Sequence, residues 1–314
     1  MRPFRKFSQN YVFQLLRGRP NSFLLLTTGP LVFFWYNTSR CQINDRLRLD
    51  LFGPRLREFG AKLFVEMFNV SRKEEDDITS LNYKEKLTNM MIDAFLLDRR
   101  LDRETANRQC QRVSLIVERI MKANPDLPAP KVHLTIGKSL QAFSLGHHVV
   151  LSQGSLNMWT DSQLAFIICH EMAHHQLDHH MENVSWLCVE FIVTLAIFIS
   201  FVRSKRSLLY VTLIWLLVKP FKLFVSYPIR RIGELEADDI GLEMVAKACM
   251  DVGEVFLFWK ILQAVSPIES EILTLFTTHP SHRTRGRRME LLTEKILKIR
   301  RKAGCEAVDV FYET

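Results

Sequence analysis

The chain has 314 residues and carries 42 lysine and arginine residues against 34 acidic ones, a formal net charge of +8. A composition that is 47% hydrophobic and 24% charged can bury a core, which excludes a disordered chain, and the length fits one large or two small domains. Six cysteines without a C-x-x-C pair exclude a disulfide-stapled mini-domain and a cysteine-type zinc finger. The basic excess is concentrated before the first acidic residue, Asp45, which argues against a nucleic-acid-binding domain.

Residues 1–44 are predicted to be a targeting leader. Residues 1–19 are rich in arginine and aromatic residues and contain no acid, which is typical of an organelle transit peptide. An uncharged stretch follows at 20–39, and its apolar part, 23–36, is shorter than the roughly 20 residues that a membrane span requires. Its aromatic end suits a membrane interface, so this part of the leader is either a membrane anchor or a further cleaved segment.

Residues 45–130 are predicted to form a helical N-terminal region. Apolar residues recur at helical spacing through 81–121, and a proline-rich stretch at 124–130 ends this block. Val132, Leu134 and Ile136 then alternate with polar residues, and residues 149–151 form a second strand-like run. We therefore expect a mainly α protein of the α+β class, with a small sheet at the start of a domain that spans 131–314.

An apolar insert, 185–225, interrupts this last domain. Residues 185–202 contain one charge, Glu190, and residues 207–218 contain none. A buried core hairpin is one explanation, but the length of the first stretch favours a membrane-associated hairpin. Twelve helical residues rise only about 18 Å, short of a ~30 Å hydrocarbon core, so a shallow or re-entrant hairpin is favoured over two crossings. Glu190 is then expected to face protein or water.

The residues H-E-M-A-H at 170–174 match the H-E-x-x-H pattern. Thr160 and Gln163 form a capping-box pattern at the start of the apolar helix that leads into it. Positions i and i+4 share a helix face, so His170 and His174 can present two nitrogens to one ion. Glu171 can hold a zinc-bound water and accept its proton, since zinc lowers the pKa of that water to about 7. A surface patch of histidines is the alternative.

A catalytic zinc ion needs a third protein ligand, and the run E-L-E-A-D at 234–238 offers one. Glu234 and Asp238 lie four residues apart and reach the same side of a helix. Glu234 can bind the ion while Asp238 accepts the N–H of a ligating histidine. A solvated acidic helix face is the alternative, but the combination with H-E-x-x-H favours one Zn²⁺ per chain. His174 and Glu234 must then lie on the same side of any membrane.

These two motifs, with T-H-P-S at 278–281, resemble the gluzincin peptidases of the HtpX and CAAX prenyl protease superfamily over about residues 130–290. The basic leader, the modest length and the apolar insert resemble its mitochondrial Oma-type branch of inner-membrane metalloendopeptidases. The resemblance implies a zincin-type domain in which His170, His174 and Glu234 are zinc ligands and Glu171 is the general base. It also implies a substrate-binding edge strand at 141–146, although Gln141 replaces the family's usual Asn.

The resemblance further implies that His279 stabilises the tetrahedral intermediate by donating to the oxyanion. A simple turn is the alternative, because His-Pro ends helices readily. The neighbouring histidines, His175, His179 and His180, are expected to share the H-E-x-x-H helix and either to point off the ligand face or to lie further along it. Asp178 is expected to lie at the solvent end of the helix or beside the ligands. A basic cluster near the C-terminus is expected to be a solvated helix face: Arg283, Arg285, Arg287 and Arg288.

We therefore expect a zinc metalloendopeptidase that hydrolyses membrane-associated proteins near the bilayer and binds the substrate strand along 143–152. The Oma-type resemblance implies the mitochondrial inner membrane, protein quality control, a stress response with self-processing, and a homo-oligomer. A CAAX-type enzyme would need more membrane-spanning segments. Two alternatives are a peptidase of the same superfamily in another membrane compartment and an inactive, zinc-bound scaffold or chaperone. The intact H-E-x-x-H argues against the scaffold.

Overall fold

The computed structural model describes residues 38–40, 43–51, 89, 103–137, 139–204, 212, 216, 222–265 and 277–306. The predictions made for residues 1–37 and for most of 52–102 and 205–221 lie outside the described residues. The chain divides into two compact units, Met1–Arg57 and Glu58–Thr314. In the first unit, β1 (Thr38–Arg40) pairs antiparallel with β2 (Leu47–Leu49).

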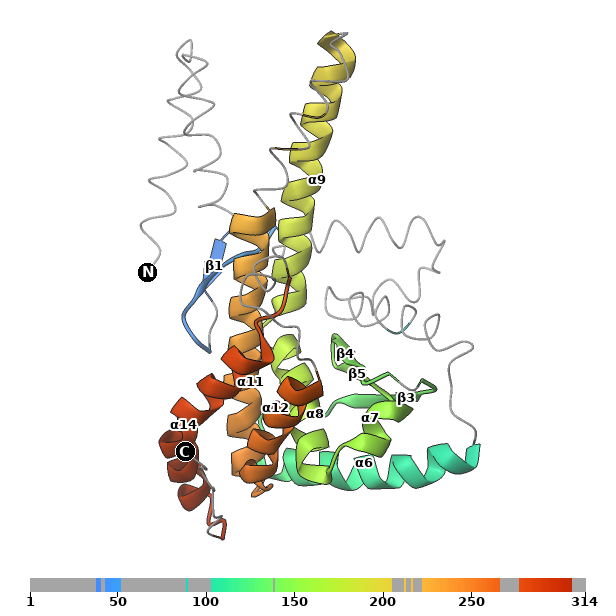
Figure 1. Ribbon diagram of the computed structural model, residues 1–314, viewed down its shortest axis with the longest axis vertical. Helices are drawn as coiled ribbons and strands as arrows, with labels where there is room; N and C mark the ends of the chain where they lie inside the picture. The colour runs from blue at the N-terminus through green and yellow to red at the C-terminus, as the bar shows by residue number, and fades with distance from the viewer. Residues whose placement is uncertain are drawn as a thin grey trace, which may run out of the picture. The chain divides into compact units, whose positions relative to one another are not determined.

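In its described residues the second unit is mainly helical with one small sheet, which confirms the mainly α (α+β) part of the predicted fold class (Figure 1). The sheet has the strand order β3-β5-β4. The central strand β5 (His148–Ser152) is buried throughout and pairs parallel with β3 (Lys131–Thr135) and antiparallel with β4 (Ala142–Leu145). Strand β4 is therefore an edge strand of this sheet within the described part of the chain.

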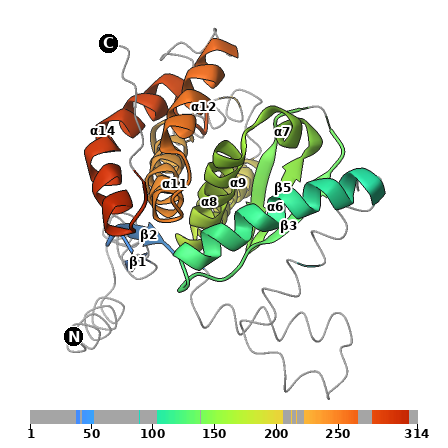
Figure 2. The same cartoon turned by 90° about the horizontal axis from the view of Figure 1, so that it is seen from below.

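The helices that the structure describes over their whole length in this unit are α6 (Arg103–Ala123), α7 (Gln153–Met158), α8 (Asp161–Gln176), α9 (His179–Ser204), α11 (Tyr227–Lys247), α12 (Val252–Val265) and α14 (His282–Lys302), and the short π-helix η1 (Lys222–Ser226) precedes α11. Helix α8 lies at the centre, between α11 on one side and the sheet with α6 on the other (Figure 2). Helix α14 packs against α11 and α12. The core is thus built around the helix that carries H-E-x-x-H.

The predicted capping box begins α8. The hydroxyl of Thr160 accepts a hydrogen bond from the Gln163 amide at 3.3 Å, and the side chain of Gln163 accepts one from the Thr160 amide at 3.1 Å. The next six residues, 164–169, are apolar on all sides because the helix is surrounded by other elements, and five of them are buried. The start of α8 is therefore fixed before the first histidine is reached.

Helix α9 contains the first apolar stretch of the predicted insert. Several of its large apolar side chains are exposed, among them Leu187, Phe191 and Phe198. Glu190 has a protein partner, as expected, because Nζ of Lys222 in η1 lies 3.2 Å from its carboxylate. None of the helices within the described ranges is long and apolar enough to cross a membrane. The membrane-associated hairpin remains a prediction.

A disulfide joins Cys249, just after α11, to Cys305, just after α14. The Cα atoms of the two residues are 5.2 Å apart, and 56 positions separate them in the sequence. Spacing in the sequence did not indicate this bridge. It connects the ends of two helices that both contribute residues to the site described below.

Candidate metal centre and catalytic site

Three side chains predicted to bind zinc lie together between α8 and α11. The Nε2 atoms of His170 and His174 are 3.1 Å apart, and the carboxylate oxygens of Glu234 lie 3.6 and 3.4 Å from them. One ligand atom from each residue lies within 4.8 Å of the others. Two imidazole nitrogens and one carboxylate are a donor set that zinc takes at catalytic sites, with a fourth position open to water. The residues present therefore fit a zinc ion.

The two helices approach closely at this point because Gly241 of α11 has no side chain. A Cβ atom at Gly241 would lie 3.0 Å from the backbone nitrogen of His170 and 3.1 Å from its Cα. Glu234 is two helical turns before Gly241, so it reaches the ligand face of α8. The glycine thus sets the distance between the H-E-x-x-H helix and the third candidate ligand.

Asp238 and Arg285 form the wall behind these ligands. The Asp238 carboxylate is fully buried and lies 2.9 Å from Nδ1 of His170. It also accepts two hydrogen bonds from Arg285, at 2.7 and 2.6 Å. Burial raises the pKa of Asp238, but the Arg285 guanidinium and His170 outweigh it and hold that pKa below its usual range. An ionised Asp238 can fix the Nδ1–H tautomer of His170, which leaves Nε2 for a metal.

Arg285 corrects the prediction of a solvated basic face on α14. Arg283, Arg287 and Arg288 are exposed, but Arg285 is 8% exposed and its guanidinium lies 4.3 Å from the ring centroid of Trp259. It is buried because it shares a helix face with core residues at intervals of four and three positions, namely Met289, Thr293 and Ile296. That periodicity was the available signal in the sequence.

The charges of the site are strongly coupled. Burial lowers the pKa of His170, but its contacts with Asp238 and Glu234 outweigh burial and raise the pKa to about 10. Burial raises the pKa of Glu234, whereas hydrogen bonds with His170, His174 and His279 hold it well below its usual range. The metal-free site therefore pairs an imidazolium with two carboxylates, and a metal ion that binds His170 must displace a proton.

His179 corrects a second prediction, because it contacts the back of a candidate ligand. Its Nδ1 lies 2.9 Å from Nδ1 of His174, and its Nε2 lies 3.0 Å from a carboxylate oxygen of Glu236. The reason is a break in the helix: Asp178, exposed as expected, has a φ of 53°, so α8 ends and α9 begins there. One continuous helix would have carried His179 away from the ligands.

The candidate general base, Glu171, faces the edge of the sheet. Its carboxylate accepts a hydrogen bond from the Ser144 hydroxyl at 2.8 Å, and Nε2 of His180 lies 3.1 Å from the same hydroxyl. Ser144 belongs to the edge strand β4 and is 4% exposed. The sequence placed Ser144 in the predicted edge strand 141–146 but did not indicate that its side chain, or that of His180, contacts the base.

His279 lies at the rim of the site. Its side chain is 64% exposed, and its Nδ1 is 3.0 Å from a carboxylate oxygen of Glu234. Residues 277–279 form a bend before α14, and the Thr277 hydroxyl donates to the His279 carbonyl at 2.8 Å. The turn and the catalytic position proposed for His279 are thus compatible, since the turn presents the ring to the candidate metal ligands.

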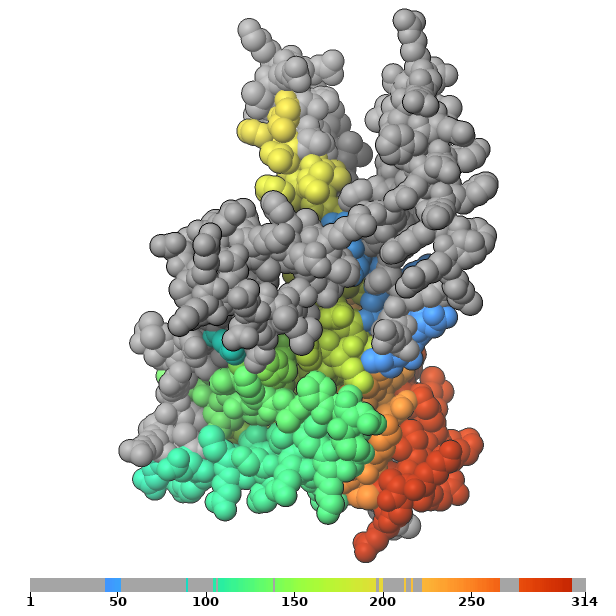
Figure 3. All heavy atoms as spheres, turned by 180° about the vertical axis from the view of Figure 1, so that it is seen from behind, coloured from blue at the N-terminus to red at the C-terminus, as the bar shows by residue number. Residues whose placement is uncertain are grey.

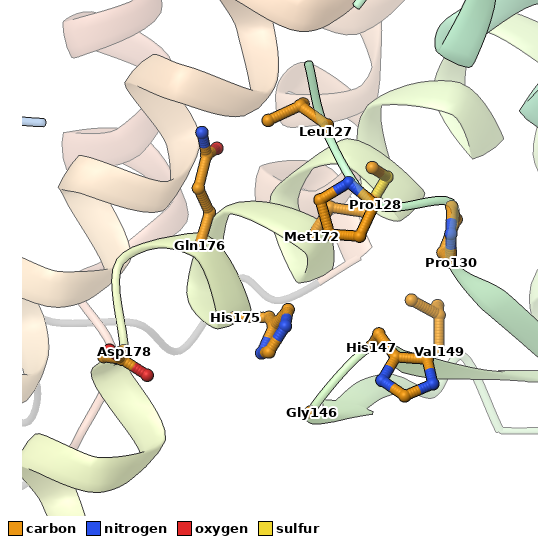
Figure 4. A pocket seen from close by; sticks show the side chains of 10 residues that line it. All are labelled: Leu127, Pro128, Pro130, Gly146, His147, Val149, Met172, His175, Gln176 and Asp178. Atoms are coloured by element: carbon orange, nitrogen blue, oxygen red, sulfur yellow. The ribbon is translucent and has the colours of Figure 1, made fainter. Parts of the chain in front are cut away.

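A cavity of about 110 Å³ borders His174, Glu234 and His279, and two larger cavities also lie near α8. One, of about 210 Å³, is bordered by His170, Glu171 and His279 and has an apolar wall that includes Trp159, Phe166, Phe258, Trp259 and Leu262. The other, of about 240 Å³, lies at the C-terminal end of α8 (Figure 4). His147 and His175 stand on its opposite sides, with ring centroids 6.3 Å apart, and Leu127, Pro128 and Pro130 form an apolar wall. The cavity of about 210 Å³ borders the candidate ligand His170 and the candidate base Glu171. The cavity of about 240 Å³ is lined by none of the candidate metal ligands.

The helix-borne histidine pair, the carboxylate from a neighbouring helix and the adjacent sheet edge define a zincin-type metallopeptidase site. Residues 107–293 match the profile of peptidase family M48, and the chain belongs to this family. The resemblance predicted from the H-E-x-x-H and E-L-E-A-D residues is confirmed. Family membership implies a catalytic metal ion.

Named relatives come from two branches of the predicted superfamily. The mitochondrial metalloendopeptidase OMA1 of Bos taurus is 30% identical over 203 residues, 62% of this chain and 39% of that protein. The OMA1 protein of Danio rerio is 27% identical over 283 residues, 87% of this chain and 54% of that protein. A protease HtpX homolog of Dictyoglomus turgidum is 27% identical over 199 residues, 54% of this chain and 66% of that protein. The chain thus spans two-fifths to about half of these OMA1 proteins.

Proposed function

We propose that this protein is a zinc-dependent metalloendopeptidase. The observation that carries the proposal is the convergence of Nε2 of His170, Nε2 of His174 and the Glu234 carboxylate beside Glu171. These residues would hold one Zn²⁺ per chain, which when bound would polarise a peptide carbonyl and acidify a water. The donor set, rather than any single residue, distinguishes a metal centre from an acidic helix face.

Side chains of the protein would carry out the proton transfer, orient the metal ligands and stabilise the oxyanion. The Glu171 carboxylate, held by the Ser144 hydroxyl, accepts the proton of the attacking water and can return it to the leaving amine. Asp238 and Arg285 keep the His170 ring oriented from behind. His279, exposed at the rim and next to Glu234, can donate a ring N–H to the developing oxyanion.

The substrate is proposed to bind as an extended strand along β4. This edge strand runs beside Glu171, and an added strand would be recognised mainly through its backbone hydrogen bonds. The 210 Å³ cavity next to His170 and Glu171 has room for one side chain rather than for a whole small-molecule ligand, since such ligands fill roughly 300–1,000 Å³. Its apolar wall would accept an apolar side chain near the scissile bond.

We propose that the protein acts at the mitochondrial inner membrane on membrane-associated proteins. Relatives named mitochondrial OMA1 support the mitochondrion, and the exposed apolar side chains of α9 support association of the insert 185–225 with a lipid bilayer. The leader 1–44, the helical region 45–130, the peptidase domain 131–314, a homo-oligomeric state and a role in stress-linked quality control remain proposals. Residues 1–44 fused to a fluorescent reporter would decide between mitochondria and another membrane compartment.

The activity is tested with the full chain purified in detergent and loaded with zinc. Wild type is expected to bind one zinc ion and to cleave an unfolded protein. Glu171→Gln is expected to bind zinc equally well but to lose about 10²–10⁴-fold in cleavage rate, because the general base is gone. Glu243→Gln, in an exposed ion pair with Lys295, is the matched control and should keep full activity. Undiminished cleavage by Glu171→Gln would refute the mechanism, and zinc binding without cleavage in wild type would favour the scaffold.

A further inference from the structure

The hydroxyl of Ser144 joins three elements of the site. Ser144 is on the edge strand β4, its hydroxyl donates to Glu171 on α8 at 2.8 Å, and Nε2 of His180 on α9 lies 3.1 Å away. The residue is 4% exposed, so bulk water does not readily substitute for either partner. The hydroxyl oxygen of Ser144 thus connects strand β4, helix α8, which carries the candidate base, and helix α9.

The direction of these hydrogen bonds follows from the chemistry of the groups. An ionised carboxylate only accepts hydrogen bonds, so the single hydroxyl proton of Ser144 must point to Glu171. The Ser144 oxygen can then accept the N–H of His180 if that proton is on Nε2. The chain from His180 through Ser144 to Glu171 thus has one consistent set of hydrogen-bond directions. It therefore fixes which way the Glu171 carboxylate faces.

The strand pairing explains why Ser144 points to the base. In β4, Ala142 and Ser144 are paired with Leu151 and Val149 of β5, both of which belong to the core against α8. Because strand side chains alternate, the Ser144 hydroxyl faces α8 while the backbone of the same strand forms the open edge of the sheet. Ser144 thus links the carboxylate of Glu171 to the strand backbone with which a substrate strand would pair.

We propose that Ser144 is a positioning residue that holds Glu171 in register with the substrate-binding edge. This inference rests on the proposed peptidase function. A substrate strand that pairs with β4 is placed relative to the same backbone that orients the base carboxylate. Without the hydroxyl, the long Glu171 side chain can rotate among its rotamers, and fewer bound substrates find the carboxylate aligned. Loss of the Ser144 hydroxyl should therefore lower the turnover number and leave substrate binding unchanged.

The experiment compares Ser144→Ala, Ser144→Thr and Ser139→Ala in the zinc-loaded full chain, with an internally quenched peptide as substrate. A hydrogen bond to a charged group implies that Ser144→Ala lowers kcat by roughly 10- to 100-fold, with KM within about twofold. Ser144→Thr keeps the hydroxyl and should recover most of the kcat. Ser139→Ala is the matched control: it is an exposed serine in the segment just before β4 and should behave as wild type. Zinc content should be equal in all four proteins, and thermal unfolding should show that each of them is folded at the assay temperature.

The outcomes separate the inference from the function on which it rests. A Ser144→Ala protein whose kcat stays within twofold of wild type, or whose KM alone rises, overturns the positioning role. That result would leave the peptidase mechanism intact if Glu171→Gln is inactive. If Glu171→Gln keeps full activity, both fall together. Loss of zinc from Ser144→Ala would also count against the proposal, because a positioning role for the base predicts an unchanged metal site.

Discussion

Asp238 of α11 and Arg285 of α14 are joined by two hydrogen bonds, of 2.6 and 2.7 Å, in a region closed to solvent. The same carboxylate lies 2.9 Å from the candidate ligand His170. The orientation of a ligand on α8 therefore depends on a cation supplied by a third helix. The H-E-x-x-H motif therefore identifies the site, but Asp238 and Arg285, more than 60 positions further along the chain, hold its first histidine in place.

Asp238→Asn is expected to destabilise the protein strongly. The substitution leaves the buried Arg285 charge with an incomplete set of partners, and breaking a buried ion pair in this way costs about 3–5 kcal/mol. Urea unfolding of the metal-free protein measures the loss. The matched control is Asp239→Asn, which breaks the partly exposed pair with Arg288 and should cost less than about 1 kcal/mol. Equal losses in the two variants would contradict the structural role assigned to Asp238.

Zinc affinity and the stability of the metal-free protein are expected to change in opposite directions with pH. The pKa of His170 is raised in the folded protein from 6.5 to about 10. The stability gained by protonating His170 is therefore complete below about pH 6.5 and is lost as pH rises towards 10. Zinc must displace that proton, so its affinity should rise about tenfold per pH unit over the same range. Chelator competition and thermal unfolding at several pH values test both trends; a pH-independent affinity would contradict the assignment.

The parts of the site that the sequence predicted are those set by local geometry. Helical periodicity places His170 and His174 on one face, and the capping box at Thr160 fixes where that helix begins. The pairing of this helix with Glu234 was predicted only because the two motifs together match the donor set of a zinc site. Local rules therefore placed the two histidine ligands, and the chemistry of the zinc donor set added Glu234.

The parts that were missed depend on packing between distant segments. Arg285 lies in a run of arginines, where composition favours a solvated face and only tertiary packing selects one member for burial. His179 was misplaced because the left-handed conformation of Asp178, at a φ of 53°, ends α8 where the residue pattern continues as a helix. Ser144 was missed because its contact with Glu171 depends on the packing of β4 beside α8. The alternation of residues along a strand does not show which helix that strand packs against.

His179→Ala is expected to weaken zinc binding. His179 supports the ring of His174 from behind and is itself held by Glu236, and loss of such an outer partner typically costs 10–100-fold in metal affinity. Glu236→Gln should have a smaller effect in the same direction, because an amide oxygen can still accept the His179 N–H. The measurement is the zinc dissociation constant, with Glu243→Gln on the same helix as a half-buried control that contacts none of the candidate ligands in the described contacts. An unchanged affinity in His179→Ala would show that His174 needs no such support.

Gly241→Ala and Gly233→Ala are expected to have opposite effects although both lie in α11. A Cβ at Gly241 would meet the backbone of α8 at 3.0–3.3 Å, and a buried helix cannot retreat without disturbing the core. We expect a loss of about 1–3 kcal/mol in unfolding free energy and weaker zinc binding, since Glu234 would move away from His170. A Cβ at Gly233 would make an ordinary contact of 3.5 Å with the His179 ring, so the helix propensity of alanine should stabilise that variant by up to about 1 kcal/mol. Chemical unfolding of the two variants side by side tests the close approach of the helices, and stabilisation by both substitutions would contradict it.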